Sequence, residues 1–389
     1  MTVAFRTFGC RLNRAEALDE EARYQAAGYA IVGLDGVPPD VIVVRGCSVT
    51  ARAQRDCEKE IARLRALFPL SEIRLAGCLP GIQSNNQTIP QSENRTIPFP
   101  VPLATSRAYL KVQDGCSGKC AFCIVPQFRG SPVSVPFDNV LARARDFLDA
   151  GYRELVVTGC NLALYRSAGH GLADLLSALA ELGPSHRVRL GSLEPGICDA
   201  SILDAFERHA NICRFIHLSL QSGSDTVLRR MNRPYTVEQV AGFCSEAFRR
   251  LGPRLALGAD VIAGFPGETG EEHELTRTFL RQTGELPFTN LHVFPYSERP
   301  GTPAATMDGA LPRAVRLARA RELEELGRAQ RMAFARTFLG QTVEVCVEKD
   351  GRHGWTSEYL PCRLKGPALR RSLVSVVVDR VEDDTLFAL

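Results

Sequence analysis

The chain has 389 residues, of which 45% are hydrophobic and 23% are charged, and its formal net charge is +3. This length suggests roughly two or three domains, and the composition indicates neither a disordered chain nor a membrane protein. An apolar stretch at 255–265 is too short to span a bilayer. The N-terminus lacks the features of a signal peptide. We therefore expect a cytoplasmic protein with no membrane partner, whose near-neutral charge neither requires nor excludes nucleic acid.

Thirteen cysteines are a high and odd number for a cytoplasmic protein. Disulfides are a poor explanation in a reducing compartment. Metal binding, catalysis or burial in the core remain as roles for these thiols.

The first 80 or so residues alternate between strand-like and helix-like patterns, which predicts a small parallel α/β domain. The strand-like runs lie at 3–8, 41–44 and 73–76, and the helical patterns at 13–27 and 50–68. A Gly-Cys dipeptide follows each strand-like run, at Gly9-Cys10, Gly46-Cys47 and Gly77-Cys78. Since the carboxyl ends of parallel strands meet at one edge of a sheet, we expect these three thiols to converge.

A stretch rich in Asn, Gln, Ser, Thr and Pro, at 80–106, predicts a linker. After it, strands and helices alternate regularly. The predicted strands begin near residues 109, 154, 187, 215, 255 and 288, and the predicted helices cover 139–150, 172–182, 200–209, 237–249 and 271–282. Six strands with right-handed helical crossovers predict a partial parallel barrel.

An arginine-rich helical pattern at 312–338 precedes short β-rich runs that predict a small β-barrel. The fold class is therefore α/β, with a small parallel N-terminal domain, a partial (β/α)6 barrel and a C-terminal β-barrel. We expect domains at 1–86, 107–337 and 338–389, with the linker at 87–106.

The strongest chemical signal is a C-x3-C-x2-C loop formed by Cys116, Cys120 and Cys123. Iron-sulfur clusters are usually held by four thiolates, so three thiolates leave one iron open for a ligand. A structural zinc loop or three unrelated thiols are the alternatives. For Cys10, Cys47 and Cys78 the spacing alone leaves a second cluster and buried core thiols both open.

This loop, with Phe122 before its last cysteine, resembles that of the radical S-adenosylmethionine superfamily. Together with the three Gly-Cys cysteines, the chain resembles the methylthiotransferases over nearly its whole length. Further stretches carry this resemblance: Val112–Cys116, Leu220–Asp225, Met231–Thr236, Asp260–Thr269 and Phe294–Thr302. The resemblance implies a second [4Fe-4S] cluster on Cys10, Cys47 and Cys78, whose free iron carries the sulfur that is transferred. One S-adenosylmethionine then supplies the methyl group, and another supplies the radical that removes hydrogen from carbon.

The resemblance also implies cofactor contacts at the ends of the third and fourth barrel strands. These candidates are Ser192, Glu194, Gln221 and Ser222. Arg129 and Arg233 offer only a charge and a position, so a surface or structural role is as good an interpretation. For Cys160, which also follows a strand, we favour buried packing, and the six remaining cysteines receive no role.

Members of the family modify isopentenyladenosine or threonylcarbamoyladenosine in tRNA, or an aspartate in a ribosomal protein. The segment Gly354–Tyr359 is similar to the threonylcarbamoyladenosine branch, which implies methylthiolation at position 37. The implied partners are the tRNA anticodon loop and an electron donor such as flavodoxin or ferredoxin. A rival of another class is a non-catalytic iron-sulfur protein that binds RNA.

Basic residues in the tail and in the long helix are candidate phosphate contacts. They are Arg363, Lys365, Arg370 and Arg371, and Arg313, Arg316, Arg319, Arg321 and Arg328. A solvated surface of mixed charge is the alternative. Trp355 and Tyr359 could stack on unpaired bases or pack inside.

Two features depart from the family pattern. Arg45-Gly46 replaces the usual Asn-Thr before the second cysteine, and would place a cation beside the cluster. The spacing between Cys78 and Cys116 is short, which implies a trimmed N-terminal domain.

Overall fold

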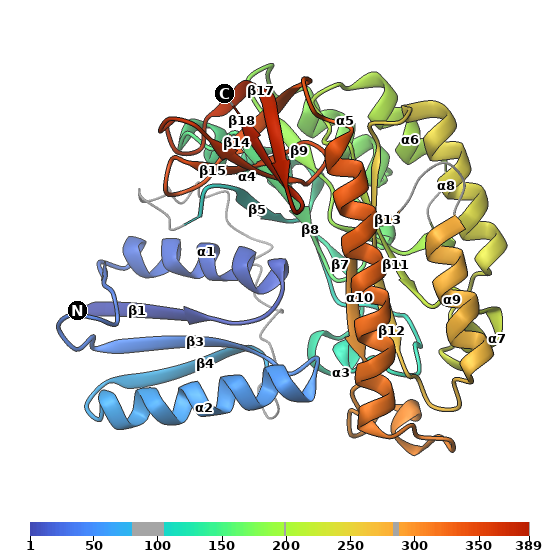
Figure 1. The fold of residues 1–389 in the computed structure, drawn as a ribbon. Helices are drawn as coiled ribbons and strands as arrows, with labels where there is room; N and C mark the ends of the chain where they lie inside the picture. Colours follow the sequence, from blue (N-terminus) through green and yellow to red (C-terminus); the bar gives the residue numbers. More distant parts are fainter. Residues whose placement is uncertain (80–104, 198–199, 283–287, 389) are drawn as a thin grey trace.

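The N-terminal domain is a parallel sheet with the strand order β2-β1-β3-β4. This computed structural model describes residues 1–79, 105–197, 200–282 and 288–388. The elements of the domain are β1 (Thr2–Thr7), α1 (Arg11–Ala26), β2 (Ala30–Ile31), β3 (Val41–Cys47), α2 (Ala51–Leu67) and β4 (Glu72–Cys78). Helices α1 and α2 lie on opposite faces of the sheet (Figure 1), so β3 is buried along its whole length. The predicted parallel α/β domain is confirmed.

The central domain is the predicted partial barrel, with its third strand divided in two. Its strands are β5 (Ala108–Lys111), β8 (Glu154–Thr158), β9 (Arg187–Arg189), β10 (Ser192–Leu193), β11 (Phe215–Gln221), β12 (Ala256–Ala263) and β13 (Phe288–Pro295). They form two parallel sheets, β5-β8-β9 and β10-β11-β12-β13. The helices are α4 (Phe137–Asp149), α5 (Leu172–Ala180), α6 (Ala200–Arg208), α7 (Asp225–Arg230), α8 (Val237–Leu251) and α9 (Gly270–Gln282), with 3-10 turns at Leu162–Leu164, Pro195–Ile197 and Pro303–Thr306.

A short antiparallel pair that the sequence did not predict closes the base of the cysteine loop. It consists of β6 (Gln113–Asp114) and β7 (Val133–Ser134), and α3 (Val125–Arg129) follows the last cysteine of the loop. The loop is therefore held at both ends, which limits how far its thiols can move.

The long helix α10 (Arg313–Arg336) lies along β13, on the outside of the barrel (Figure 1). Helix α10 can approach β13 closely because Gly327 has no side chain. A Cβ atom at this position would lie 3.0 Å from the side chain of Leu291 on β13. Among the described residues, no helix is both long and apolar enough to cross a membrane.

The C-terminal residues form a closed β-barrel, as predicted. Its strands are β14 (Thr342–Val347), β15 (His353–Thr356), β16 (Pro361–Leu364), β17 (Leu373–Glu382) and β18 (Thr385–Ala388), in the order β14-β15-β16-β18-β17. Phe215, the first residue of β11, is fully buried in one apolar cluster with Phe338 and the core of this barrel. Burial of an aromatic side chain contributes about 1.5–3 kcal/mol, so this contact anchors the barrel on the central domain.

The N-terminal domain also packs directly on the central domain. Ala15 and Leu18 of α1 are buried in the same cluster as Leu110 of β5 and Leu155 of β8. The predicted linker at 87–106 lies outside the described residues except for Thr105 and Ser106.

Candidate active site

Cys10, Cys47 and Cys78, at the ends of the N-terminal strands, come together at one edge of the sheet and form the first set of thiols. Cys47 and Cys78 are the last residues of β3 and β4 and face each other in register. Cys10 immediately precedes α1. Burial, reinforced by the charges of Cys10 and Cys78, raises the pKa of Cys47 to about 11, and Cys10 also acts on Cys78. Such thiols become ligands when a metal displaces their protons.

Glycine before the cysteine has a physical reason at two of these positions. Gly9 has φ +90° and Gly77 has φ +85°, in the region that side chains rarely adopt. A Cβ atom on Gly9 would lie 2.7 Å from Cβ of Cys47. The glycine therefore lets the chain turn while Cys10 approaches the end of β3.

The C-x3-C-x2-C loop gathers the second set of thiols. Cys116, Cys120 and Cys123 are each partly buried, and their charges act on one another. The amide of Gly118 donates to Sγ of Cys116 at 3.2 Å. Burial raises the pKa of Cys123 to about 11. Each set supplies three thiols, which is the arrangement expected for a cluster with one open iron.

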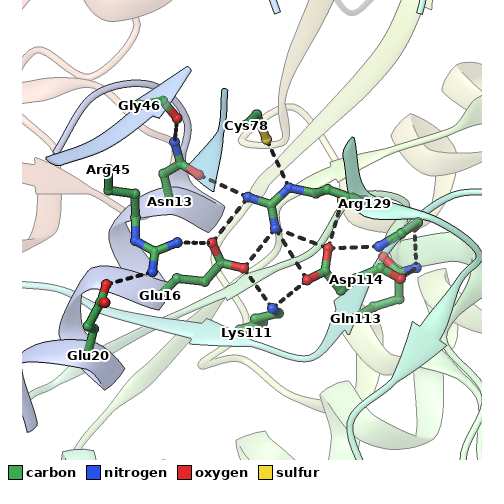
Figure 2. A network of polar contacts seen from close by, with 12 residues as sticks. Asn13, Glu16, Glu20, Arg45, Gly46, Cys78, Lys111, Gln113, Asp114 and Arg129 are labelled. Atoms are coloured by element: carbon green, nitrogen blue, oxygen red, sulfur yellow. Dashed lines mark hydrogen bonds and ion pairs between the residues drawn. The ribbon is translucent and has the colours of Figure 1, made fainter. Parts of the chain in front are cut away.

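Arg129 connects Cys78 to the base of the cysteine loop through a buried polar network (Figure 2). Its Nε donates to Sγ of Cys78 at 3.1 Å. One terminal nitrogen donates to Glu16 at 2.7 Å and to Asp114, two residues before Cys116, at 3.1 Å. The Arg129 side chain is only 1% exposed, so these contacts form in a low-dielectric interior where each is strong. The surface role considered for Arg129 is excluded.

Glu16 on α1 is the counter-charge of this network. It accepts from Arg129, from Lys111 at 2.7 Å and from Arg45 at 2.7 Å. Burial alone would raise the pKa of Glu16, but the hydrogen bond and charge of Arg129 and the charges of Lys111 and Arg45 lower it to about 2. The carboxylate is therefore ionised at neutral pH and links the two domains.

Arg45, which we expected to place a cation beside the first set of thiols, is held in ion pairs with the N-terminal helix. Its guanidinium pairs with Glu16 and with Glu20, each at 2.7 Å, as Figure 2 shows. Two carboxylates on α1 neutralise the charge. The arginine that contacts a cysteine of this set is Arg129.

Arg233 has the corresponding position at the second set. It donates to Sγ of Cys120 at 3.0 Å and pairs with Glu194 at 3.2 Å. Glu194 also accepts from Asn161 and is 9% exposed. Glu194 therefore lies beside the cysteine loop, although its two oxygens already have partners.

The other predicted cofactor contacts lie in different settings. Ser192 is exposed on β10. Gln221 ends β11 with φ +66°, a strained conformation for a residue other than glycine. Ser222 is 1% exposed and bonds Oγ1 of Thr276 at 3.1 Å. Cys160 donates to Asp114 at 3.3 Å, so it has a polar partner rather than the purely packed position that we favoured.

Three neighbouring barrel strands bring together a group that the sequence analysis missed. Nε2 of His217 and Nδ1 of His292 lie 3.1 and 3.2 Å from the same oxygen of Asp260. Burial opposes ionisation of Asp260, but the two histidines lower its pKa. Such a group could hold a divalent cation or bond polar atoms of a substrate. A signal was present for Asp260, because it interrupts the otherwise apolar strand β12.

Several basic residues considered for RNA have protein partners instead. Arg371 donates to the backbone of Ala150 and to Tyr152, and Arg370 bonds Ser106. Arg363 and Lys365 are exposed. Trp355 and Tyr359 stack on each other, with 4.7 Å between their ring centroids.

Comparisons with known proteins agree with this geometry. Residues 110–280 match the radical SAM superfamily, and residues 2–97 match the uncharacterized protein family UPF0004. Over 78% of this chain and 77% of the other, the fold is similar to the radical S-adenosylmethionine methyltransferase TsrM from Kitasatospora setae (TM-score 0.56, 15% identity). The fold and the cysteine loop define a radical S-adenosylmethionine enzyme, a class that works with that cofactor and an iron-sulfur cluster.

Curated relatives narrow this class further. The chain is 32% identical to the threonylcarbamoyladenosine tRNA methylthiotransferase MtaB of Chlamydia pneumoniae, covering 97% of this chain and 95% of the relative. It is 31% identical to MtaB of Bacillus subtilis, covering 94% and 90%. It is also 31% identical to the tRNA-2-methylthio-N(6)-dimethylallyladenosine synthase of Mycobacterium ulcerans, covering 96% and 78%. The chain belongs to the radical S-adenosylmethionine methylthiotransferase family.

Proposed function

We propose that this chain converts N6-threonylcarbamoyladenosine at position 37 of tRNA to its 2-methylthio derivative. The observation that carries the proposal is the presence of two separate sets of three thiols, each with an arginine donating to one sulfur. MtaB relatives, whose name states this substrate, match nearly the whole chain. The partner in RNA is then the anticodon loop.

In this proposal Cys116, Cys120 and Cys123 hold one [4Fe-4S] cluster, and Cys10, Cys47 and Cys78 hold the other. The donor sets fit, because thiolates are the usual ligands of such clusters and N–H donors to sulfur tune their potential. When bound, the clusters and S-adenosylmethionine supply the methyl group, the sulfur and the hydrogen-abstracting radical. Flavodoxin or ferredoxin is the kind of electron donor that this chemistry requires.

The chain's own residues hold and shield these groups. Arg129 and Arg233 stabilise negative charge on the sulfurs of Cys78 and Cys120 because each donates an N–H from a buried position. Ser192, Glu194, Gln221 and Ser222 remain the proposed contacts to S-adenosylmethionine. The ion pair of Glu194 with Arg233, which itself donates to Cys120, supports a role for that carboxylate beside the cysteine loop.

A second candidate substrate is isopentenyladenosine, because the Mycobacterium ulcerans relative named for the dimethylallyl substrate is as similar in sequence. The test is anaerobic turnover of the reconstituted protein with tRNA carrying either substituent, followed by mass spectrometry of the nucleosides. We expect 2-methylthio-threonylcarbamoyladenosine together with 5'-deoxyadenosine. A methylthio product only on the isopentenyl tRNA, or no product on either, would contradict the proposal.

A further inference from the structure

Tyr359 lies at the junction of all three domains in a strained conformation. Its φ is +64°, in a region that non-glycine residues rarely adopt. The ring stacks on Trp355 and on Phe215 of the central domain, with distances of 4.7 and 5.0 Å between the ring centroids. Such strain persists only where the surroundings fix the residue, and it is commonest at functional positions.

A fully buried group of charges fixes the turn that carries Tyr359. Glu154 pairs with Arg187 at 2.6 Å and with Arg189 at 2.8 Å. Arg187 donates to the carbonyl of Trp355 at 2.6 Å, and Arg189 to that of Thr356 at 2.8 Å. Burying charges is costly unless they are paired and hydrogen-bonded. Here the buried charges position one turn of the C-terminal barrel against the central domain.

Three arginines surround the Tyr359 ring. The guanidinium carbons of Arg189, Arg11 and Arg107 lie 4.9, 5.4 and 6.0 Å from its centroid. Burial alone would raise the pKa of Tyr359, yet these charges lower it. The charges of these arginines therefore act on the hydroxyl of Tyr359.

Arg11 differs from the other two arginines in its pairing. Arg189 pairs with Glu154, and Arg107 pairs with Glu348 at 3.0 Å. Within the described ranges, Arg11 has no carboxylate partner; it donates to the hydroxyl of Tyr359 at 3.1 Å. A guanidinium has five N–H donors, so most of the donors of Arg11 remain available for a ligand.

We propose that Arg11 and the hydroxyl of Tyr359 form a subsite for an oxyanion of the substrate, namely the carboxylate of its threonylcarbamoyl group. This inference rests on the proposed function. A guanidinium binds a carboxylate through two parallel hydrogen bonds. Because Arg11 follows Cys10 directly in the chain, the subsite lies beside the thiols that the proposal assigns to sulfur transfer. An apolar isopentenyl group would leave the guanidinium unpaired, which disfavours that substrate.

Binding of anticodon stem-loop RNAs tests this subsite without turnover. The RNAs differ only at position 37, which carries threonylcarbamoyladenosine, adenosine or isopentenyladenosine, and the holoprotein is kept anaerobic. We expect the wild type to bind the threonylcarbamoyl RNA about tenfold or more tightly than the adenosine RNA. Arg11→Gln should abolish this ratio while affinity for the adenosine RNA stays unchanged. An equal loss for all three RNAs would assign Arg11 to an RNA phosphate, and an unchanged ratio would exclude the subsite.

Two further variants serve as a control and as a second test of the subsite. Arg14→Gln removes an exposed cation one turn further along α1 and should preserve the ratio. If Arg11→Gln loses iron, Tyr359→Phe deletes only the hydroxyl and should still reduce the ratio; an unreduced ratio overturns the proposal. Nucleoside analysis of wild-type turnover distinguishes failure of the subsite from failure of the proposed function. If the wild type forms 2-methylthio-threonylcarbamoyladenosine but Arg11→Gln keeps the wild-type binding ratio, only the subsite is refuted. If the wild type does not form that nucleoside, the proposed function is refuted.

Discussion

Nε of Arg129 lies 3.1 Å from Sγ of Cys78, and the same guanidinium holds Glu16 on α1 and Asp114 before the cysteine loop. One side chain therefore couples the edge of the N-terminal sheet to the base of the loop that carries the other thiols (Figure 2). Movement of one domain against the other would break these contacts.

Replacing Arg129 tests this coupling. We expect Arg129→Leu to lower the free energy of unfolding by about 3–5 kcal/mol, because Glu16 and Asp114 lose a buried partner. Chemical denaturation of both proteins gives the difference. Arg74→Leu is the matched control, because Arg74 pairs with Glu72 at the surface and should cost at most about 1 kcal/mol. Equal effects of the two substitutions would show that the buried network contributes little.

The pKa of Glu16 predicts a pH dependence. A carboxyl group whose pKa is about 2 when folded and near the ordinary value of about 4.3 when unfolded stabilises the fold above pH 4.3. That contribution, about 3 kcal/mol at neutral pH, is lost as the pH falls from about 4.3 towards 2.

Unfolding of the metal-free chain at several pH values measures this effect. The difference in unfolding free energy between the wild type and Glu16→Gln should be largest at neutral pH and should shrink below about pH 4.3. A difference that stays constant between pH 3 and pH 7 would mean that Glu16 is not the ionised centre of the network.

Sequence patterns predicted the parts of the molecule that local rules govern. Strand and helix periodicity predicted the three folding units. The Gly-Cys dipeptide after each strand-like run predicted that Cys10, Cys47 and Cys78 converge, because the carboxyl ends of parallel strands meet at one edge of a sheet. The roles of Arg129 and Arg233 could not be predicted. Their sulfur partners are 51 and 113 residues away in the chain, and no local pattern encodes such a contact.

Buried polar residues within strands are a signal that could have been used. Arg187 and Arg189 alternate within β9 and so point to one face, where Glu154 pairs with both. Asp260 likewise interrupts the apolar strand β12, and it contacts His217 of the neighbouring strand. Charge at alternate positions of a buried strand predicts a buried ion pair, although it does not identify the partner.

A side chain at Gly9 should disrupt the first set of thiols. Gly9→Ala adds strain at φ +90° and brings a methyl group within 2.7 Å of Cβ of Cys47, so we expect loss of about half of the bound iron. Gly28→Ala is a close control, since Gly28 has φ +87° but nothing within 4 Å of the added atom. Iron analysis after identical reconstitution checks this, and retention of full iron by Gly9→Ala would contradict it.

Glu154 should control docking of the C-terminal barrel. Glu154→Gln leaves Arg187 and Arg189 buried without the carboxylate that pairs with both, and we expect a loss of about 3–5 kcal/mol in stability. Hydrogen exchange should speed up in β14 and β15 before it does so elsewhere. Glu348→Gln removes a partly exposed carboxylate of the same region and should leave exchange near the wild-type rate. Faster exchange confined to the N-terminal domain would argue against this role.

The central claim is that two sets of three thiols each hold an iron-sulfur cluster. Iron and sulfide per chain test it most directly, measured for the wild type and for two triple alanine variants, one at Cys10, Cys47 and Cys78 and one at Cys116, Cys120 and Cys123. About eight irons are expected in the wild type and about four in each variant, while alanine at the buried Cys57, Cys213 and Cys244 changes nothing. Full iron content in either of the first two variants would contradict the account.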